Sequence, residues 1–267
     1  MKIYISADIE GVTGVTHWDE TDLNKADSQI AREQMTAEVV AACEGALQAG
    51  ASEIWVKDAH WTGRNIIASK LPKEVKTIRG WSGSPMIMVQ ELDITFQGVV
   101  FIGYHARAGM ATNPLSHTMT GQVASVTIND RQASEFLIHA YAAAYLKVPV
   151  VFVSGDKGLC ADVSQFNPYI QTVAVKQGIG NSTINIHPEL ATALIREGVA
   201  KALTGDMNRF QVTMPANFIT KIQYKEHTKA YLYGNYPGAN QVDACTVQYE
   251  NKSYAEIMRF MLFAMSF

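Results

Sequence analysis

Apolar residues along the chain gather into short continuous runs, separated by longer segments in which they recur every three or four positions. The clearest runs lie at residues 2–7, 98–103 and 149–154. Short continuous apolar runs are typical of strands that are buried on both faces of a parallel sheet. In residues 28–49, by contrast, the apolar side chains share one face at helical spacing. This pattern predicts a helix that ends at Gly50.

The two patterns alternate through the rest of the chain. Further strands are expected at residues 53–57, 123–129, 171–175, 209–214, 220–224 and 244–249, and further helices at 85–92, 133–146, 188–203 and 253–265. Such alternation predicts an α/β fold with a mostly parallel sheet flanked by helices. A glycine-containing turn at 178–182 predicts a division into an α/β domain, 1–180, and a smaller α+β domain, 181–267.

Composition and charge exclude several classes of protein. The 267 residues are 48% hydrophobic and 18% charged, with a net charge of −3 and no basic run, so nucleic acid is not an expected partner. No apolar stretch is long enough to span a bilayer, and the opening strand leaves no room for a signal peptide. The three cysteines are far apart and suit a reducing compartment. We therefore expect a cytoplasmic globular protein that binds no membrane.

Metal-binding residue types follow three of the predicted strands. Asp8 and Glu10 end the first run, His60 follows the strand at 53–57, and His105 follows the run at 98–103. Residues two apart in an extended chain point to the same side, so the two carboxylates would repel each other unless a cation lay between them. Because the carboxyl ends of parallel strands share one edge of the sheet, these side chains are expected to meet.

A fourth candidate, Glu135, lies at the start of the helix predicted at 133–146. Two histidines and three carboxylates without cysteine suit Zn²⁺, Mn²⁺, Co²⁺ or Fe²⁺. Five ligands exceed what one tetrahedral zinc uses, which favours two ions roughly 3.5–4 Å apart with a bridging carboxylate, for which we choose Asp8. Each residue alone also has an ordinary structural explanation, as a loop cap, a hydrogen-bonded histidine or a helix-start carboxylate. Their repetition at strand ends favours the metal site.

The chain lacks the glycine-rich motifs of dinucleotide and phosphate sites and the G-x-S-x-G motif of serine hydrolases. It does contain an ordered set of short motifs: Asp8–Gly14 (DIEGVTG), Asp58–His60 (DAH), Gly103–Arg107 (GYHAR), Ser116–Met119 (SHTM), Ile128–Arg131 (INDR) leading to Glu135, and Val175–Gln177 (VKQ). Together these motifs resemble the DppA-type, zinc-dependent D-aminopeptidase family. The resemblance covers the first two-thirds of the chain densely and the last third loosely.

The resemblance implies a role for each candidate. Asp8, Glu10 and His60 would bind one zinc, and Asp8, His105 and Glu135 the second, so the protein would hold two Zn²⁺ per subunit. His117 matches the active-site histidine of the family. Lys57 departs from the Asn that the resemblance leads us to expect before the Asp-x-His motif, and Trp61 after it is expected to reshape the pocket.

The implied activity is a metal-dependent aminopeptidase that hydrolyses peptides or amides with a free N-terminal D-amino acid, such as D-alanine. A water activated by the two zinc ions would be the nucleophile. The expected partners are a small peptide or amino-acid amide as substrate and further copies of the chain, in a decameric ring as in the family. The alternatives are another two-metal amidohydrolase, an L-specific exopeptidase, a phosphoesterase, or a non-catalytic metal- or peptide-binding protein.

Overall fold

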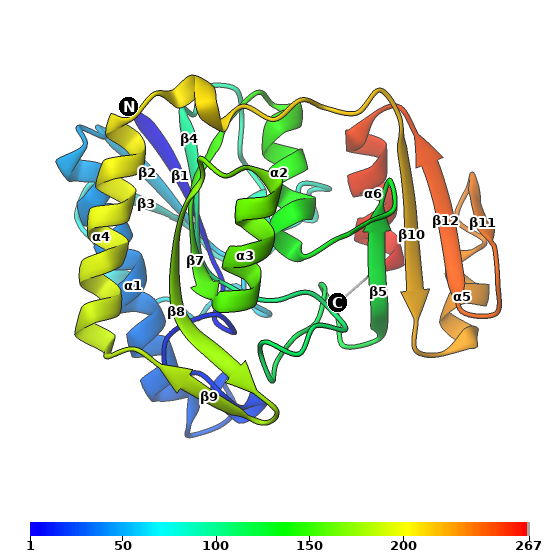
Figure 1. The fold of residues 1–267 in the computed structure, drawn as a ribbon, viewed down its shortest axis with the longest axis horizontal. Helices are drawn as coiled ribbons and strands as arrows, with labels where there is room; N and C mark the ends of the chain where they lie inside the picture. The colour runs from blue at the N-terminus through cyan, green and yellow to red at the C-terminus, as the bar shows by residue number, and fades with distance from the viewer. Residues whose placement is uncertain (266–267) are drawn as a thin grey trace.

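The computed structural model describes residues 1–265 and contains two β-sheets with helices packed around them (Figure 1). The larger sheet has the strand order β3-β2-β1-β4-β7-β8-β9, and only the pairing of β8 with β9 is antiparallel. Its strands are β1 (Lys2–Ala7), β2 (Glu53–Asp58), β3 (Val75–Ile78), β4 (Gly98–Tyr104), β7 (Val150–Asp156), β8 (Gln171–Ile179) and β9 (Ser182–Asn185). The predicted mostly parallel sheet is therefore confirmed.

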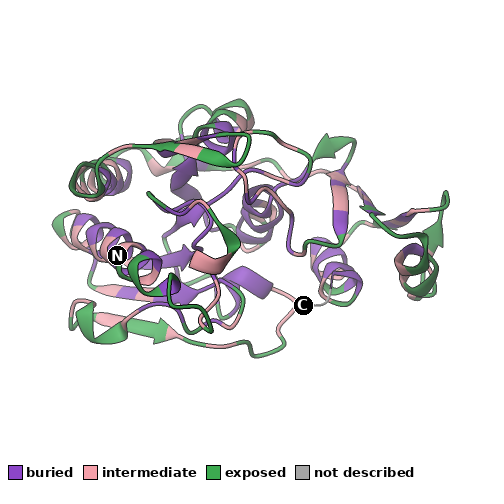
Figure 2. Ribbon diagram, turned by 90° about the horizontal axis from the view of Figure 1, so that it is seen from below, coloured by how far each residue is buried: buried purple, intermediate pink, exposed green. Residues whose placement is uncertain are grey.

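Helices cover both faces of this sheet. On one face, α1 (Ser28–Gln48) packs against α4 (Pro188–Thr204), and on the other lie α2 (Glu135–Tyr145) and α3 (Lys157–Phe166) (Figure 1). The central strands and the inward sides of these helices are buried, whereas the helix surfaces that face outward are exposed (Figure 2). Within residues 1–265, no helix combines the length and the apolar character needed to cross a membrane.

The smaller sheet is antiparallel and has the order β11-β12-β10-β5-β6. Its strands are β5 (Val123–Ile128), β6 (Arg131–Gln132), β10 (Phe218–Tyr224), β11 (Ala239–Gln241) and β12 (Thr246–Asn251), with α5 (His227–Tyr233) and α6 (Tyr254–Ala264) beside them. Helix α6 also contacts α2, which joins the two sheets. The smaller α+β portion is confirmed. The division at residue 180 stays a prediction, and this sheet takes strands from both sides of it.

Two local predictions differ from the structure, and two helices were not predicted. The expected strand at 209–214 is wrong, because η4 (Met207–Phe210) is a short 3₁₀ turn capped by Asp206. The expected helix at 85–92 is reduced to the 3₁₀ turn η3 (Ile87–Val89). Helices α3 and α5 were not predicted, since both are short and follow a strand closely, α3 directly after β7 and α5 three residues after β10. The remaining short turns are η1 (Trp18–Glu20) and η2 (Ala68–Lys70).

The sheet order reverses direction between β1 and β4, which makes their carboxyl ends the expected ligand-binding edge. Two glycines let the chain segments approach closely there. The Gly11 N–H donates to the Gly103 carbonyl at 2.8 Å, and a side chain at Gly11 would overlap the Tyr104 carbonyl oxygen. Gly103 has φ +67°, a left-handed conformation that favours glycine. The residues after β1 and β4 are therefore held against each other.

Candidate metal centre

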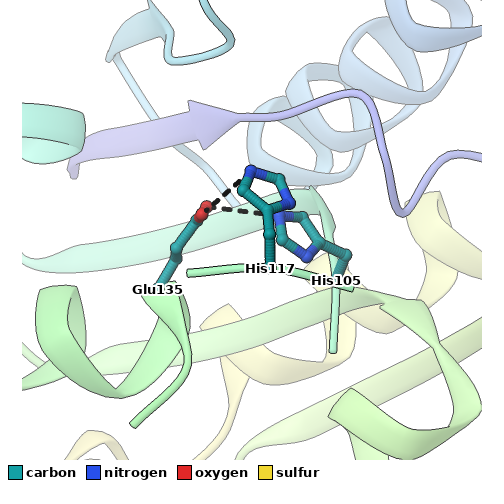
Figure 3. A group of neighbouring side chains, drawn as sticks. All are labelled: His105, His117 and Glu135. Atoms are coloured by element: carbon teal, nitrogen blue, oxygen red, sulfur yellow. Dashed lines mark ion pairs between the residues drawn. The ribbon is translucent and has the colours of Figure 1, made fainter. Parts of the chain in front are cut away.

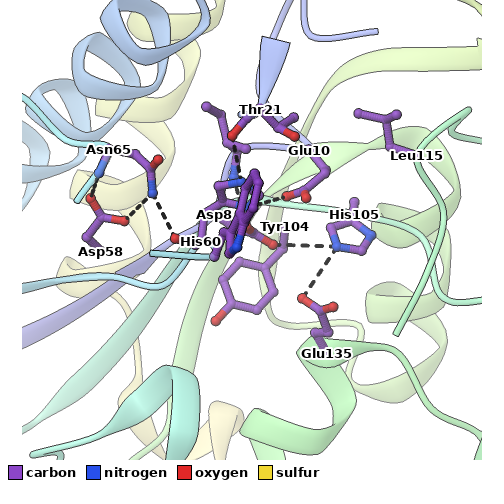
Figure 4. Close-up of polar contacts among 12 residues, drawn as sticks. Asp8, Glu10, Thr21, Asp58, His60, Asn65, Tyr104, His105, Leu115 and Glu135 are labelled. Carbon is purple, nitrogen blue, oxygen red and sulfur yellow. Dashed lines mark hydrogen bonds and ion pairs between the residues drawn. The ribbon is translucent and has the colours of Figure 1, made fainter. Parts of the chain in front are cut away.

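Asp8 and Glu10 follow β1 directly, and both side chains are buried. His60, two residues after β2, points between them (Figure 4). Its Nδ1 atom lies 3.2 Å from Oδ1 of Asp8 and 3.1 Å from Oε2 of Glu10. The structure thus brings together the residues at the ends of two neighbouring parallel strands.

His105 and Glu135 lie on the other side of Asp8 (Figure 4). Nε2 of His105 is 3.5 Å from Oδ2 of Asp8 and 3.4 Å from Oε2 of Glu135. Asp8 therefore presents one carboxylate oxygen to each histidine. Glu135 comes from the first turn of α2, and its Oε1 accepts a hydrogen bond of 2.6 Å from the Met119 N–H.

Glu135 reaches the cluster from the start of α2, the helix start at which it was expected from the sequence. The strand that precedes it, β5, does not belong to the parallel sheet but pairs with β10 in the smaller one. Glu135 is positioned instead by the start of α2, where the Ser134 hydroxyl accepts a hydrogen bond from the Leu137 N–H. An N-capping serine fixes the direction of the first helical turn and hence the side chain that follows it.

His117 lies in the loop before β5 and completes the group (Figure 3). Its ring stacks on that of His105 with a centroid distance of 4.4 Å and an interplanar angle of 11°. Its Nε2 is 3.6 Å from Oε1 of Glu135. The same ring makes an edge-to-face contact with Trp18, with 5.3 Å between the centroids. The six residues predicted for the site from sequence therefore lie together, and their individual roles stay predictions.

Each of the three imidazoles has one ring nitrogen in contact with a backbone carbonyl. The distances are 3.0 Å from His60 Nε2 to Thr21 O, 2.9 Å from His105 Nδ1 to Ala106 O, and 2.9 Å from His117 Nδ1 to Leu115 O. A neutral histidine donates through that nitrogen, so the lone pair of the other one faces the carboxylates. Two electron-rich groups face each other stably only with a cation between them, either a proton or a metal ion.

The charges within the cluster depend strongly on one another. Burial raises the pKa of Asp8, and Glu10 raises it further. Burial would also raise the pKa of Glu135, but the His105 charge outweighs it and lowers the pKa to about 2. Burial would lower the pKa of His105, yet Glu135 raises it to about 10. Protons on ligand residues leave when a metal binds. A metal cation can therefore take the place of the proton that His105 carries beside Glu135.

The donor set fits zinc. Among the described residues, the buried atoms Oε2 of Glu10 and Nε2 of His105 have no hydrogen-bond partner. Mixed nitrogen and carboxylate donors are ordinary zinc ligands. Donor atoms within 4.8 Å of one another come from two groups, Asp8, Glu10 and His105, and His105, His117 and Glu135. His60 falls outside both groups, although it contacts Asp8 and Glu10, so this grouping differs from the one that the resemblance implies.

A buried shell holds the loop that carries His60 (Figure 4). Asp58 accepts hydrogen bonds from the N–H groups of Asn65 and Ile66, at 2.5 and 2.7 Å. The Asn65 side-chain amide donates to the His60 carbonyl at 2.8 Å. Lys57 is buried beside them, and its amino group donates to the Gly80 carbonyl at 2.8 Å. The same amino group donates to the Asp58 carbonyl at 2.5 Å, so the departure at Lys57 affects the segments of Asp58 and Gly80 and does not touch the donor atoms of His60.

A further group of hydrogen-bonded polar residues, on the other side of the cluster, was not predicted from sequence. Asp156, at the end of β7, accepts hydrogen bonds from the Ala106 N–H at 2.7 Å and the Asn113 amide at 3.1 Å. Asn113 also donates to the Glu10 carbonyl at 2.9 Å, and the buried Lys176 amino group donates to the same carbonyl. For Asp156 and Lys176, the signal that could have identified them was their position near the carboxyl ends of β7 and β8, because that edge of the sheet also carries Asp8 and His105. Asn113 lies in the loop after β4 and carried no such signal.

A cavity of about 420 Å³ opens beside the cluster. Acidic, aromatic and methionine side chains surround it, so it combines the metal-binding groups with an apolar wall. Besides Asp8, Glu10, His60, His117 and Glu135, its lining includes Trp18, Asp19, Asp22, Trp61, Trp81, Met88 and Met119. Trp61 lines the pocket, as its position after His60 suggested.

Known proteins similar to this chain share both its sequence pattern and its fold. The model of the Peptidase M55 family, described as D-aminopeptidase, matches residues 1–263. A D-aminopeptidase of Bacillus subtilis (strain 168) is 33% identical over 264 residues, covering 98% of this chain and 96% of that protein. The solved structure of the Zn-dependent D-aminopeptidase DppA from Bacillus subtilis, described as a self-compartmentalizing protease, matches with a TM-score of 0.92, 33% identity, and coverage of 99% of this chain and 96% of that one.

Proposed function

Because the chain belongs to the D-aminopeptidase family of peptidases, we propose that it removes a free N-terminal amino acid of D configuration from peptides or amides. The observation that carries this proposal is the buried cluster in which imidazole lone pairs and carboxylates face one another beside a cavity. The zinc dependence of the structural relative supports zinc as the cation.

We assign Asp8, Glu10 and His60 to one zinc ion, and Asp8, His105 and Glu135 to a second. The two oxygens of Asp8, each facing a different histidine, support its role as the bridge. When bound, such a pair lowers the pKa of a water toward neutrality and polarises a carbonyl group. The protein contributes by fixing the donor atoms through backbone hydrogen bonds and by excluding solvent around them.

His117 is proposed to transfer protons during the reaction. Burial and the neighbouring His105 lower the pKa of His117, so its imidazole is neutral at pH 7 and can accept a proton. The contact between Nδ1 and the Leu115 carbonyl leaves Nε2 as the accepting atom. The proton would then pass to the departing amine, which leaves as the free amino group of the product.

We also propose that the protein forms a closed homo-oligomer, a decameric ring by analogy with the family, since its structural relative is described as self-compartmentalizing. Light scattering on the purified chain would measure the assembly. A particle of about ten subunits is expected, and a stable monomer would contradict the proposal. A cytoplasmic location stays a prediction from the cysteine usage.

An amide panel tests the proposed activity. D-alaninamide, L-alaninamide and a phosphate monoester would be offered to chelated protein and to the same protein after zinc is restored. We expect turnover of the D-amide, only with zinc, and at least about tenfold above the L-amide. Faster turnover of the L-amide or the phosphate ester would show a different hydrolase, and dipeptide binding without turnover in metal-replete protein would show a non-catalytic binder.

A further inference from the structure

Three tryptophans surround the mouth of the cavity: Trp18, Trp61 and Trp81, which we call the aromatic rim. Their exposed fractions are 44%, 53% and 36%, so each ring keeps a large accessible surface next to the buried metal-binding residues. A group of accessible apolar rings around a cavity marks a binding surface rather than a core. The sequence-based expectation of a small substrate side chain such as that of alanine leaves these rings without a role.

The backbone at Trp61 is strained. Trp61 has φ +41°, in a region that bulky side chains rarely adopt, and it directly follows His60. Such conformations persist when surrounding contacts hold them, and they concentrate at binding sites. Here the indole N–H of Trp81 donates to the Trp61 carbonyl at 2.6 Å. The strained residue is therefore fixed by a second ring of the same rim.

Trp81 is in turn positioned from behind by a buried charge. The amino group of Lys57 lies 3.8 Å from the centroid of the Trp81 ring, a cation–π contact, while it also donates to the carbonyl of Gly80. Lys57, Trp81 and Trp61 thus form one connected support, from the interior of β2 to the cavity mouth. A wall built in this way is preorganised, so a ligand that packs against it loses little additional freedom.

We propose that the aromatic rim is the subsite for a bulky apolar side chain on the N-terminal residue of the substrate, so that amides of D-phenylalanine, D-tryptophan or D-leucine are preferred to those of D-alanine. This rests on the proposed function. An aminopeptidase substrate has a single residue on the acyl side of the scissile bond, and its side chain lies beside the metal-binding residues. Trp61 borders that position, with 6.4 Å between its ring centroid and that of His60. A methyl group would leave most of the 420 Å³ cavity unfilled.

The test compares kcat/KM for D-phenylalaninamide and D-alaninamide in the zinc-loaded wild-type protein and in Trp61→Gly. Glycine relieves the strained φ and keeps the carbonyl that accepts from Trp81, so this variant removes only the ring. The wild type is expected to prefer D-phenylalaninamide by about tenfold or more, and the variant to lose that preference because its kcat/KM falls much further on D-phenylalaninamide than on D-alaninamide. Tyr231→Ser, at an exposed aromatic residue of α5, is the matched control and should change neither rate.

Lys57→Met is a second variant in case Trp61→Gly folds poorly. It keeps the length of the side chain but removes the charge behind Trp81 and the hydrogen bonds to the Asp58 and Gly80 carbonyls, and should raise KM for D-phenylalaninamide several-fold more than KM for D-alaninamide. Equal use of the two amides by the wild type, equal losses on both in Trp61→Gly, or a preference that follows only the second residue of D-alanyl dipeptides would each overturn the proposal.

A binding measurement separates this proposal from the proposed function. If no D-amino-acid amide is hydrolysed, the proposed function fails, but tryptophan fluorescence can still report binding of the two amides to zinc-loaded protein. About tenfold tighter binding of D-phenylalaninamide, reduced in Trp61→Gly, would support the aromatic rim as an apolar subsite. Equal affinities for the two amides would refute it.

Discussion

The cavity has two regions of opposite character. The five proposed metal-binding residues, Asp8, Glu10, His60, His105 and Glu135, are buried and positioned by strand ends and one helix start; we call them the floor, and all except His105 line the cavity. Its aromatic rim is partly exposed and comes from loops and the turn η1. The ionisation states of the floor residues depend on one another, whereas the rim offers an apolar surface. We infer that the floor sets the chemistry and tolerates little change, while the rim sets substrate choice and can vary without loss of the chemistry.

The largest effect is expected for Asp8→Ala. This substitution removes the one carboxylate that faces both His60 and His105, so both zinc ions and the hydrolytic activity should be lost. Elemental analysis would count zinc per subunit after dialysis. Asp243→Asn, at an exposed carboxylate of the smaller sheet region, should keep wild-type zinc and activity. Stoichiometric zinc in Asp8→Ala would disprove the bridging role of Asp8 and the claim that the two zinc sites depend on each other.

His117→Ala should have the next largest effect, and on rate alone. Loss of a proton-transfer group is expected to lower kcat by about 10²–10⁴-fold, while zinc content stays near the wild-type value because the five floor residues remain. His227→Ala, at an exposed histidine of α5, is the control. A fully active His117→Ala protein would refute the proton-transfer role. Loss of zinc in that variant would instead make His117 a sixth member of the floor.

Asp156→Asn should have a smaller effect, because Asp156 supports the floor without belonging to it. Its Oδ2 atom accepts from the Ala106 N–H and the Asn113 amide, and an asparagine cannot accept all the hydrogen bonds of a carboxylate. Activity is expected to fall by about 10–100-fold, with weaker zinc binding. Titration with a chelator would measure the zinc affinity. If activity and zinc affinity both match the wild type, the floor does not depend on this support.

The smallest effect is expected on the free energy of unfolding, through Glu38, a buried residue that supports the loop after Glu10. Burial raises the pKa of Glu38 to about 7, and its Oε1 accepts from the Thr13 N–H in the loop after Glu10. Because the folded state binds this proton more tightly than the unfolded state, the contribution of Glu38 to stability falls as pH rises from about 4.5 to about 7. The total loss is on the order of 3 kcal/mol.

Glu38→Gln keeps an acceptor for Thr13 but carries no charge, so it should lack this pH dependence. Urea unfolding at pH 5 and pH 8 would measure the difference in free energy of unfolding between variant and wild type. The variant should gain relative stability at pH 8. An equal difference at both pH values would show that Glu38 is not held in its protonated form by the fold.

The floor could be predicted because its residues follow a regular rule. Asp8, His60 and His105 end apolar runs, and parallel strands bring such ends to one edge of a sheet whatever the intervening loops do. Glu135 follows a different rule, because it lies at a helix start rather than at the end of a parallel strand. The predicted strand before it, β5, lies in the smaller sheet. The sequence could not show this, because alternating apolar and polar positions predict a half-exposed strand but not the strand with which it pairs.

The aromatic rim and the supports behind the floor could not be predicted in the same way. Trp18 and Trp81 lie in segments with no regular spacing of apolar residues, and they meet the cavity only through the paths of long loops. Lys57 appeared as an unexplained departure, and its contact with the Trp81 ring joins residues from separate loops and strands. Contacts of this kind depend on tertiary packing, which periodicity does not encode.

Anomalous X-ray scattering at the zinc absorption edge, from crystals of the zinc-loaded protein, tests the central claim most directly. The account predicts two zinc peaks next to Asp8, one on the side of His60 and Glu10 and one on the side of His105 and Glu135. A single peak, or peaks at other residues with the cluster of Asp8 left metal-free, would contradict it.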